Sequence, residues 1–380
     1  MLNRLKILHI VFSLDVGGLE NGVVNLCNSL DHTRFAPSIC VFQGGGALEL
    51  RVDANRVDLF EVRRYWRYDP TLPFRLAKAI HQNGAHIVHT HSWGTLVEGL
   101  GGAMMSQTPI IIHGEHGLLE ERSRNIPIQR WLWSRADRVT AVAEELAERM
   151  VKVVRFPRAR INVIHNGVDT ERFRLIENSK ASMRARFKLP ATGFILGMVA
   201  RLVPVKNHAG VFHAIARLHE QGIETDLVVA GDGPLCEPLH QMARELRIHE
   251  RVHFLGNVNS IEEVFCAIDV FVLNSQSEGM SNTILEAMAS GLPVVATAVG
   301  ANPQLVCDRE TGYLIKVNDV ESLCRAIGEL AGDFRLRTTM GQKGRLRAEV
   351  HYSVKRMVQD YSDLYMGLAQ KSKLNGSFHN

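Results

Sequence analysis

The chain has 380 residues, of which 46% are hydrophobic and 22% are charged, and its formal net charge is +4. This composition is ordinary for a soluble globular enzyme, the length favours two domains, and the charge is too small to indicate a nucleic-acid partner. No stretch approaches the roughly 18 apolar residues of a membrane span, and the six cysteines form no C-x-x-C pair, so we expect a cytoplasmic protein without disulfides or a zinc framework.

Short apolar strands alternate with amphipathic helices, which predicts an α/β fold with parallel sheets. In the first half, strands are expected near 5–12, 37–42, 57–62, 86–90, 109–113, 138–142 and 161–164. Helices are expected there near 19–30, 73–83, 95–105, 128–136 and 143–154. The apolar run at 7–12 is interpreted as a first strand and not as a signal peptide, because it leads directly into a glycine turn and a helix.

The second half restarts the pattern, as two Rossmann-like domains in tandem would. Its strands are expected near 194–200, 226–230, 252–255, 270–273, 293–297 and 312–315, and its helices near 207–221, 235–246, 261–267, 282–290, 319–331 and 335–350. We expect an N-terminal domain at 1–170, a polar linker at 171–192 and a C-terminal domain at 193–354. A last amphipathic helix is expected at about 355–370, followed by a frayed tail from Lys371.

Two groups in the first half are candidates for binding. Gly17 and Gly18 follow a strand and open a helix, so backbone can approach a ligand beside an electropositive helix N-terminus. Histidines cluster at two strand ends, at positions 89, 91, 113 and 116. Zinc is an alternative for this cluster, but the spacing matches no recurrent zinc framework, so no metal site is predicted.

The second half carries cations and glycines after its first two strands. Arg201 and Lys206 offer a guanidinium fork and an ammonium charge to one diphosphate, although a solvated charged loop would look the same. Gly231 and Asp232 lie in a G-D-G-P sequence between a strand and a helix, where the glycines permit close approach to a ligand or merely form a turn.

The stretch from Glu278 to Pro293 combines two carboxylates with a helix start. Ser281 or Asn282 is a natural N-cap, and the free N–H groups of such a helix hold phosphate. Glu278 would lie beside that anion site and Glu286 about two turns further on. An anion site flanked by two hydroxyl-binding carboxylates suits a sugar nucleotide.

This stretch closely resembles the E-x₇-E signature of the retaining glycosyltransferases of family 4, and similarity extends over nearly the whole chain. The resemblance implies the GT-B fold, with two Rossmann-like domains facing a central cleft and a last helix that crosses back to the first domain. It also implies enzymes of the bacterial exopolysaccharide and lipid-linked glycan type. One departure is that Ala301 and Gln304 stand where the family has a second glycine and a glutamate.

The resemblance assigns roles residue by residue. The implied catalytic residues are His116, Glu278, Arg201 and Lys206. The implied donor-binding residues are Gly17, Gly18, Arg201, Lys206, Gly231, Asp232, Val258, Glu278, Gly279, Met280, Ser281, Asn282 and Glu286. His91 and Glu115 are candidates for shaping the acceptor pocket, with a purely structural role as the alternative.

The function implied is metal-independent transfer, with retention, of a hexose from a UDP- or GDP-hexose to a glycan or lipid-linked acceptor. No cofactor is expected, and the chain contains no D-x-D pair to hold a divalent ion. A sugar-nucleotide 2-epimerase and a non-catalytic sugar-nucleotide-binding protein remain alternatives. Cations interleaved with aromatics at 63–68 favour peripheral contact with the anionic inner face of the cell membrane, and so does a second group, Arg122, Arg124, Arg130, Trp131 and Trp133. The alternative is an ordinary solvated rim with buried tryptophans.

Overall fold

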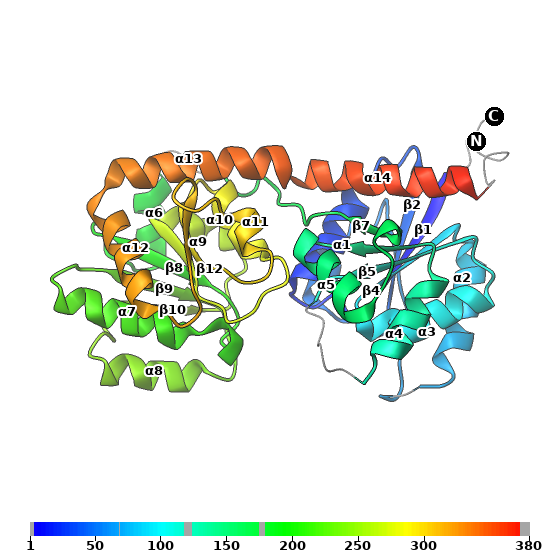
Figure 1. Ribbon diagram of the computed structural model, residues 1–380, viewed down its shortest axis with the longest axis horizontal. Helices are drawn as coiled ribbons and strands as arrows, with labels where there is room; N and C mark the ends of the chain where they lie inside the picture. The colour runs from blue at the N-terminus through cyan, green and yellow to red at the C-terminus, as the bar shows by residue number, and fades with distance from the viewer. Residues whose placement is uncertain (1–3, 68, 118–123, 175–178, 373–380) are drawn as a thin grey trace. The chain divides into compact units, whose positions relative to one another are not determined.

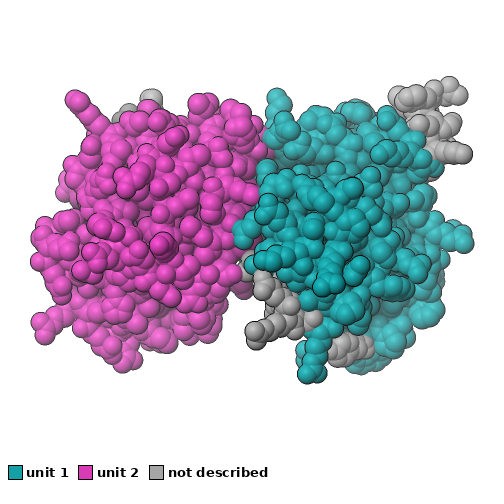
Figure 2. Space-filling view, in the orientation of Figure 1, with its two compact units in different colours: residues 1–167, 354–380 teal, residues 168–353 magenta. Residues whose placement is uncertain are grey.

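The structure is a computed structural model that describes residues 4–67, 69–117, 124–174 and 179–372. The chain divides into two compact units, one of residues 1–167 with 354–380 and the other of residues 168–353 (Figures 1 and 2). Each unit contains one sheet whose neighbouring strands pair in parallel. The predicted pair of Rossmann-like α/β domains is confirmed.

The first unit has a seven-stranded sheet in the order β3-β2-β1-β4-β5-β6-β7. Its strands are β1 (Leu5–Val11), β2 (Phe35–Val41), β3 (Asp58–Glu61), β4 (Ile87–His91), β5 (Ile110–Glu115), β6 (Arg138–Ala141) and β7 (Ile161–Val163). Its helices are α1 (Gly18–Ser29), η1 (Ala47–Arg51), α2 (Leu72–Asn83), α3 (Trp93–Met105), α4 (Ile126–Arg135), α5 (Glu144–Val154), η2 (Arg158–Arg160) and α14 (Val354–Lys371). From β1 the chain builds the sheet outward to β3, and from β4 it builds the sheet in the opposite direction. Open α/β sheets bind ligands at such a switch point, which here lies between β1 and β4.

The second unit has a six-stranded sheet in the order β10-β9-β8-β11-β12-β13. Its strands are β8 (Ile195–Val199), β9 (Asp226–Ala230), β10 (Val252–Gly256), β11 (Val270–Leu273), β12 (Val294–Thr297) and β13 (Gly312–Ile315). Its helices are α6 (Ser179–Arg186), η3 (Pro204–Lys206), α7 (His208–Glu220), α8 (Cys236–Glu245), α9 (Ile261–Ala267), α10 (Asn282–Ala289), α11 (Asn302–Leu305), α12 (Val320–Gly332) and α13 (Phe334–His351). The change of direction lies between β8 and β11.

The C-terminal helix α14 belongs to the first unit. Met357, Tyr361 and Tyr365 are buried in one apolar cluster with Ile7 of β1 and other residues of the first sheet. The expectation that the last helix returns to the first domain is therefore confirmed. Because this contact joins the two ends of the chain, the first domain is complete only when the second has been synthesised.

The segment 171–192 differs from the expected linker. It lies within the second unit, and it contains helix α6, which packs on α9. Arg184 of α6 is buried and its guanidinium donates to Asp269 at 2.7 Å and to the carbonyl of Ala267 at 3.0 Å. A buried ion pair with these additional hydrogen bonds fixes the polar segment to the domain, which its composition alone did not indicate.

Among the described helices, none is both long enough and apolar enough to cross a bilayer.

Candidate active site

The candidate donor site is formed at the carboxyl ends of β8 and β11 in the second unit (Figure 1). The loop after β8 carries Arg201 and Lys206, and the loop after β11 leads through Glu278 into α10. The two loops are joined by a hydrogen bond of 2.8 Å from the Gln276 N–H to the carbonyl of Val205. The order of the strands therefore brings together residues that lie more than seventy positions apart.

Lys206 and Glu278 form an ion pair inside this site. Lys206 Nζ lies 2.5 Å from Oε1 of Glu278, and the Ser275 hydroxyl donates to the same oxygen at 2.6 Å. Glu278 is buried, so this pair is less screened by water than a surface pair. Within the described residues, Oε2 of Glu278 has no hydrogen-bond partner and is the oxygen available to a ligand hydroxyl.

The surroundings of the Arg201 side chain differ from those of Lys206. Its side chain is exposed, and among the described residues its guanidinium has no hydrogen-bond or ion-pair partner. Arg201 is therefore free to bind an anion, whereas Lys206 has one of its three N–H groups engaged by Glu278.

The loops after β9 and β10 lie against the loop after β8. The N–H of Gly231 donates to the carbonyl of Gly256, and the N–H of Leu202 donates to the carbonyl of Asp232. Gly231 has φ +137, and a Cβ there would lie 2.1 Å from the carbonyl oxygen of Ala200, so only glycine fits. Asp232 is exposed, and Val258 is half-buried in the loop that follows β10.

Helix α10 begins as the sequence indicated. Ser281 is the N-cap, and its hydroxyl accepts from the N–H of Ile284 at 3.3 Å. Met280 is buried, and Gly279 and Asn282 are half-buried beside the cap. Glu286 is half-buried one turn into α10, and Gly291 follows the helix with φ +71.

The loop after β12 supports Glu278 through backbone contacts. A Cβ on Gly300, which has φ +54, would lie 2.1 Å from the carbonyl oxygen of Glu278, and the N–H of Ala301 donates to the carbonyl of Gly279 at 2.9 Å. Ala301 has φ −78, so this position does not require glycine. The backbone of this loop thus keeps its contacts despite the Ala301 departure, and the carbonyl of Gln304 accepts from the Tyr352 hydroxyl.

The glycine turn of the first unit lies at the start of α1. Gly17 is the N-cap, Gly18 is the first helical residue, and the Gly17 carbonyl accepts from the Asn21 side-chain amide at 2.8 Å. The space that a Cβ on Gly17 would need is occupied by the carboxylate of Glu20.

The histidines of the first unit are brought together in its interior. Nδ1 of His91 lies 3.0 Å from Nε2 of His116, and Nε2 of His91 lies 3.0 Å from Nδ1 of His9. Burial lowers the pKa of His116 to about 4 and that of His9 to about 3, and burial together with the neighbouring histidines lowers the pKa of His91 well below its usual value. These imidazoles are neutral near physiological pH.

Glu115 and His89 complete the surroundings of the chain of histidines. Glu115 is buried and accepts from the Gln129 side-chain amide at 3.3 Å, and Nδ1 of His89 lies 2.9 Å from the Tyr365 hydroxyl. Ring nitrogens of His9, His89 and His91 lie within 4.8 Å of one another, so these three are the described residues with the geometry to hold a metal ion.

Two contributors were missed by sequence reasoning. Ser275 binds Glu278, and its only signal was its position just after an apolar strand. His9 was overlooked because it lies within the apolar strand Leu5–Val11, although a histidine in such a strand is itself a signal of a buried polar partner.

The aromatic and cationic groups at the surface of the first unit are partly as expected. Tyr65, Trp66 and Trp131 are exposed, but Trp133 is fully buried, so the expectation that it forms part of this surface is wrong. Its ring packs edge-on against Phe156 in the core. Tyr68 and Arg122 lie outside the described residues.

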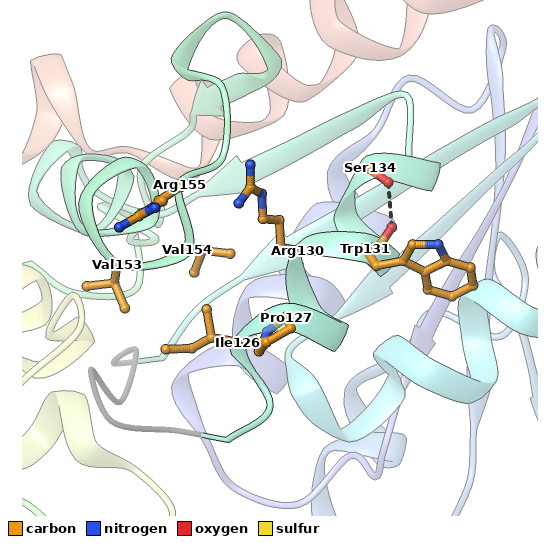
Figure 3. A pocket seen from close by; sticks show the side chains of 8 residues that line it. All are labelled: Ile126, Pro127, Arg130, Trp131, Ser134, Val153, Val154 and Arg155. Carbon is orange, nitrogen blue, oxygen red and sulfur yellow. Dashed lines mark hydrogen bonds between the residues drawn. The ribbon is translucent and has the colours of Figure 1, made fainter.

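A pocket of about 560 Å³ opens between α4 and the end of α5 (Figure 3). Ile126, Val153 and Val154 supply apolar lining, and Arg130 and Arg155 stand on the two different elements. This pocket is separate from the histidine chain, since none of the chain's residues lines it.

Comparison with known proteins decides the family. The model described as "Glycosyl transferases group 1" matches residues 179–347, and that of "Glycosyltransferase Family 4" matches residues 16–172. The chain is 30% identical over 303 residues to an Escherichia coli enzyme, UDP-Gal:alpha-D-GlcNAc-diphosphoundecaprenol alpha-1,3-galactosyltransferase, covering 77% of this chain and 78% of that one. The chain belongs to glycosyltransferase family 4.

A second sequence relative and a solved structure are also similar to this family 4 glycosyltransferase. It is 26% identical to the N-acetyl-alpha-D-glucosaminyl L-malate synthase of Bacillus anthracis over 324 residues, covering 83% of this chain and 84% of the synthase. Its fold is similar to that of Anabaena HepE solved in complex with UDP and glucose, with a TM-score of 0.86, 21% identity, and coverage of 96% and 100%. The GT-B fold predicted from the sequence is confirmed.

Proposed function

We propose that this glycosyltransferase moves a hexose from a UDP- or GDP-hexose to a hydroxyl of a glycan or lipid-linked acceptor, with retention and without a metal ion. The observation that carries the proposal is the ion pair of Lys206 with Glu278 at the switch point of the second sheet, in the loop after β8 that also carries Arg201. The E. coli relative named for UDP-Gal and a diphosphoundecaprenol-linked acceptor supports the donor and acceptor classes.

The diphosphate would bind Arg201 and the remaining N–H groups of Lys206. Two cations and the N-terminus of α10 would neutralise the leaving group, which is the task a divalent ion performs in other enzymes. Glu278 would accept hydrogen bonds from the sugar through Oε2, while its Oε1 holds Lys206 in place. Glu286 would accept from the ribose.

Retention is assigned to front-face displacement within an ion pair. The bond from the anomeric carbon to the leaving diphosphate oxygen breaks, the acceptor oxygen bonds to the same face of that carbon, and the acceptor proton passes to the diphosphate. Arg201 and Lys206 would stabilise the charge that develops on the diphosphate. His116 would hydrogen-bond the transferred sugar.

The test is NMR of reactions with UDP-, GDP- and ADP-hexoses and a lipid-diphosphate-linked sugar acceptor, run with a chelator. We expect one donor to give a product with the donor's anomeric configuration, and Glu278→Gln to lose this transfer while Glu310→Gln, an exposed control, retains it. An inverted product would contradict retention. Recovery of donor with an inverted C2 centre would favour the epimerase, and nucleotide binding without any turnover would favour the non-catalytic alternative.

We also propose that the enzyme binds peripherally to the anionic inner face of the cell membrane. Exposed Arg63 precedes exposed Tyr65 and Trp66 in the sequence, and exposed Arg130 precedes exposed Trp131. Each surface cation is worth about 1 kcal/mol near an anionic bilayer.

Sedimentation with vesicles tests the membrane proposal. Binding should rise with the anionic lipid fraction, fall with salt and weaken in Arg63→Ala/Arg130→Ala. Arg64 is left unchanged because it pairs with Glu98 at 2.8 Å, and its loss would disturb the fold. A wild type that ignores vesicles at low salt would refute the proposal and favour a soluble acceptor.

A further inference from the structure

Two aromatic side chains are exposed at the switch point of the first sheet. Phe12 follows β1 directly and is 42% exposed, and Trp93 opens α3, which follows β4, and is 38% exposed. The strands β1 and β4 pair in parallel, with Ile10 opposite Thr90. This register, continued by two residues, brings Phe12 level with Ser92, the residue before Trp93. The order of the strands therefore places both aromatic residues at one point of the carboxyl edge of the sheet.

The backbone before Trp93 is held in a strained conformation. Ser92 has φ 58 and ψ 172, a region that glycine ordinarily occupies. Its N–H donates to the carbonyl of Gly114 at 2.7 Å, and its carbonyl accepts from the N–H of Thr95 at 3.2 Å. Strain of this kind persists only where the surroundings impose it, and it is concentrated at functional sites. Here it fixes the point at which α3 begins, and hence the position of Trp93.

Gly94 leaves the surface beside Phe12 uncovered. It lies in the first turn of α3, and its φ is outside the left-handed region that favours glycine. Among the described residues, a Cβ at this position would meet only Phe12, at 3.8 Å, which is ordinary van der Waals contact. Alanine is the better helix former, so neither the backbone nor crowding requires glycine here. The missing side chain keeps an apolar surface next to Phe12 accessible to a ligand.

Carboxylates flank this surface. Asp15 is exposed three residues after Phe12, and the Ser13 hydroxyl donates to its Oδ2 at 2.7 Å. A Cβ on Gly46 would lie 2.7 Å from the backbone nitrogen of Asp15, so the loop after β2 packs on this segment. The same loop leads to Glu49, whose Oε1 accepts from the N–H of Gly46 at 3.3 Å. Carboxylates accept hydrogen bonds from hydroxyl groups, and they repel phosphate.

We propose that Phe12 and Trp93 form a binding site for a pyranose ring of the acceptor. This rests on the proposed function, in which the acceptor carries a sugar, and it identifies the residues that recognise that sugar. One face of a pyranose ring is a row of C–H groups, which packs on aromatic side chains, and its hydroxyls lie around the edge. Asp15 accepts hydrogen bonds from these hydroxyls. The site is formed by residues of the first unit alone.

A lipid bilayer is a less suitable occupant of this surface. The exposed aromatics assigned above to membrane contact, Trp66 and Trp131, each adjoin an exposed arginine in the sequence. The segment after Phe12 instead carries Asp15, and the loop packed on it carries Glu49. An anionic leaflet attracts cations and repels such carboxylates. A neutral pyranose, with an apolar face and a polar edge, matches both the aromatic residues and the carboxylates.

The binding experiment is saturation-transfer difference NMR of the full chain with the methyl α-glycosides of N-acetylglucosamine, glucose and galactose, without donor. We expect one glycoside to receive saturation, most strongly at its ring C–H protons. Trp93→Ala and Gly94→Gln should each weaken its binding about tenfold, because one removes an aromatic face and the other covers the surface. Gly367→Gln is the matched control, since a Cβ at this glycine of α14 would meet nothing within 4 Å among the described residues, and it should bind as the wild type does.

Turnover gives the second readout. In transfer to a lipid-diphosphate-linked sugar, Trp93→Ala and Gly94→Gln should raise the KM for the acceptor about tenfold, while kcat and the KM for the donor stay nearly unchanged. Trp93→Phe retains an aromatic face and should retain most of the acceptor affinity. Gly94→Gln leaves both aromatic side chains in place, so it tests the site even if Trp93→Ala fails to fold.

The contrary outcomes are distinct. A wild-type acceptor KM in Trp93→Ala and Gly94→Gln would overturn the inference, and so would a wild type that receives no saturation with any of the three glycosides. Weaker vesicle binding of Trp93→Ala with unchanged glycoside binding would assign the surface to the bilayer and refute the sugar site. If the glycoside binds as expected but the enzyme transfers no sugar, the proposed function fails instead.

Discussion

Lowering the pH should destabilise the first unit more than the second, because the first buries four neutral histidines whereas the second buries His208. His9, His89, His91 and His116 all have a pKa below the usual value, chiefly through burial. The unfolded chain binds protons on them with a pKa of about 6.5 whereas the folded chain does not, so stability falls as the pH drops below that value. The decline continues until the folded groups titrate, at about 4 for His116 and about 3 for His9.

As long as the pH stays well above the pKa values of the folded histidines, these histidines bind no protons in the folded state. The change in unfolding free energy then depends only on the protons that the unfolded chain binds. Going from about pH 7 to about pH 5.5 should lower the free energy of unfolding by about 1.2 kcal/mol for each histidine, or about 5 kcal/mol for the four. That is a large share of the roughly 5–15 kcal/mol that stabilises a typical domain.

Tryptophan fluorescence during urea denaturation measures this unit by itself. The four tryptophans, at positions 66, 93, 131 and 133, all lie in the first unit, and Trp133 is fully buried. His9→Gln should reduce the loss of unfolding free energy between these two pH values by about 1.2 kcal/mol. His81→Gln, an exposed histidine of α2, should leave it unchanged. A wild-type free energy of unfolding that differs by less than about 1 kcal/mol between the two pH values, or that is higher at the lower pH, would refute the reasoning.

Three further predictions concern the second unit. Gly300→Ala should lower the rate of sugar transfer at least about tenfold, because its Cβ would displace the backbone of Glu278, whereas Ala301→Gly should transfer as the wild type does; equal rates for both variants would contradict the contact. Arg201→Ala should lower kcat by about 10²–10³-fold in transfer assays, and a change confined to KM would argue against charge stabilisation in the transition state. Activity should survive exhaustive chelation, and loss of activity that manganese or magnesium restores would show that the two cations do not suffice.

Much of the fold could be predicted because burial sets the sequence pattern. The β11–α10 region illustrates this: an apolar strand, a serine cap at Ser281 and a left-handed glycine at Gly291 each have a local physical cause. Helix α6 could not be predicted in this way. It is short and polar, and it is held by the contact of Arg184 with Asp269, 85 positions along the chain.

The candidate site shows the same division. The placement of Arg201, Lys206 and Glu278 at strand ends could be predicted, because parallel strands deliver their following loops to one edge. The pairing of Lys206 with Glu278, and the support of Glu278 by Ser275 and Gly300, depend on the order of the strands in space. His9 was hidden for the same reason, since only the adjacency of β1 and β4 reveals its partner His91.

The central claim is that Glu286 holds the nucleotide while Glu278 acts on the sugar. Calorimetry of UDP and GDP with the wild type, Glu286→Ala and Glu278→Gln, all in the presence of a chelator, tests it most directly. The account predicts that Glu286→Ala weakens binding of the preferred nucleotide by roughly 1.5–3 kcal/mol, the range for hydrogen bonds to charged groups, and that Glu278→Gln binds it as the wild type does. Unchanged affinity in Glu286→Ala, or a loss confined to Glu278→Gln, would contradict the account.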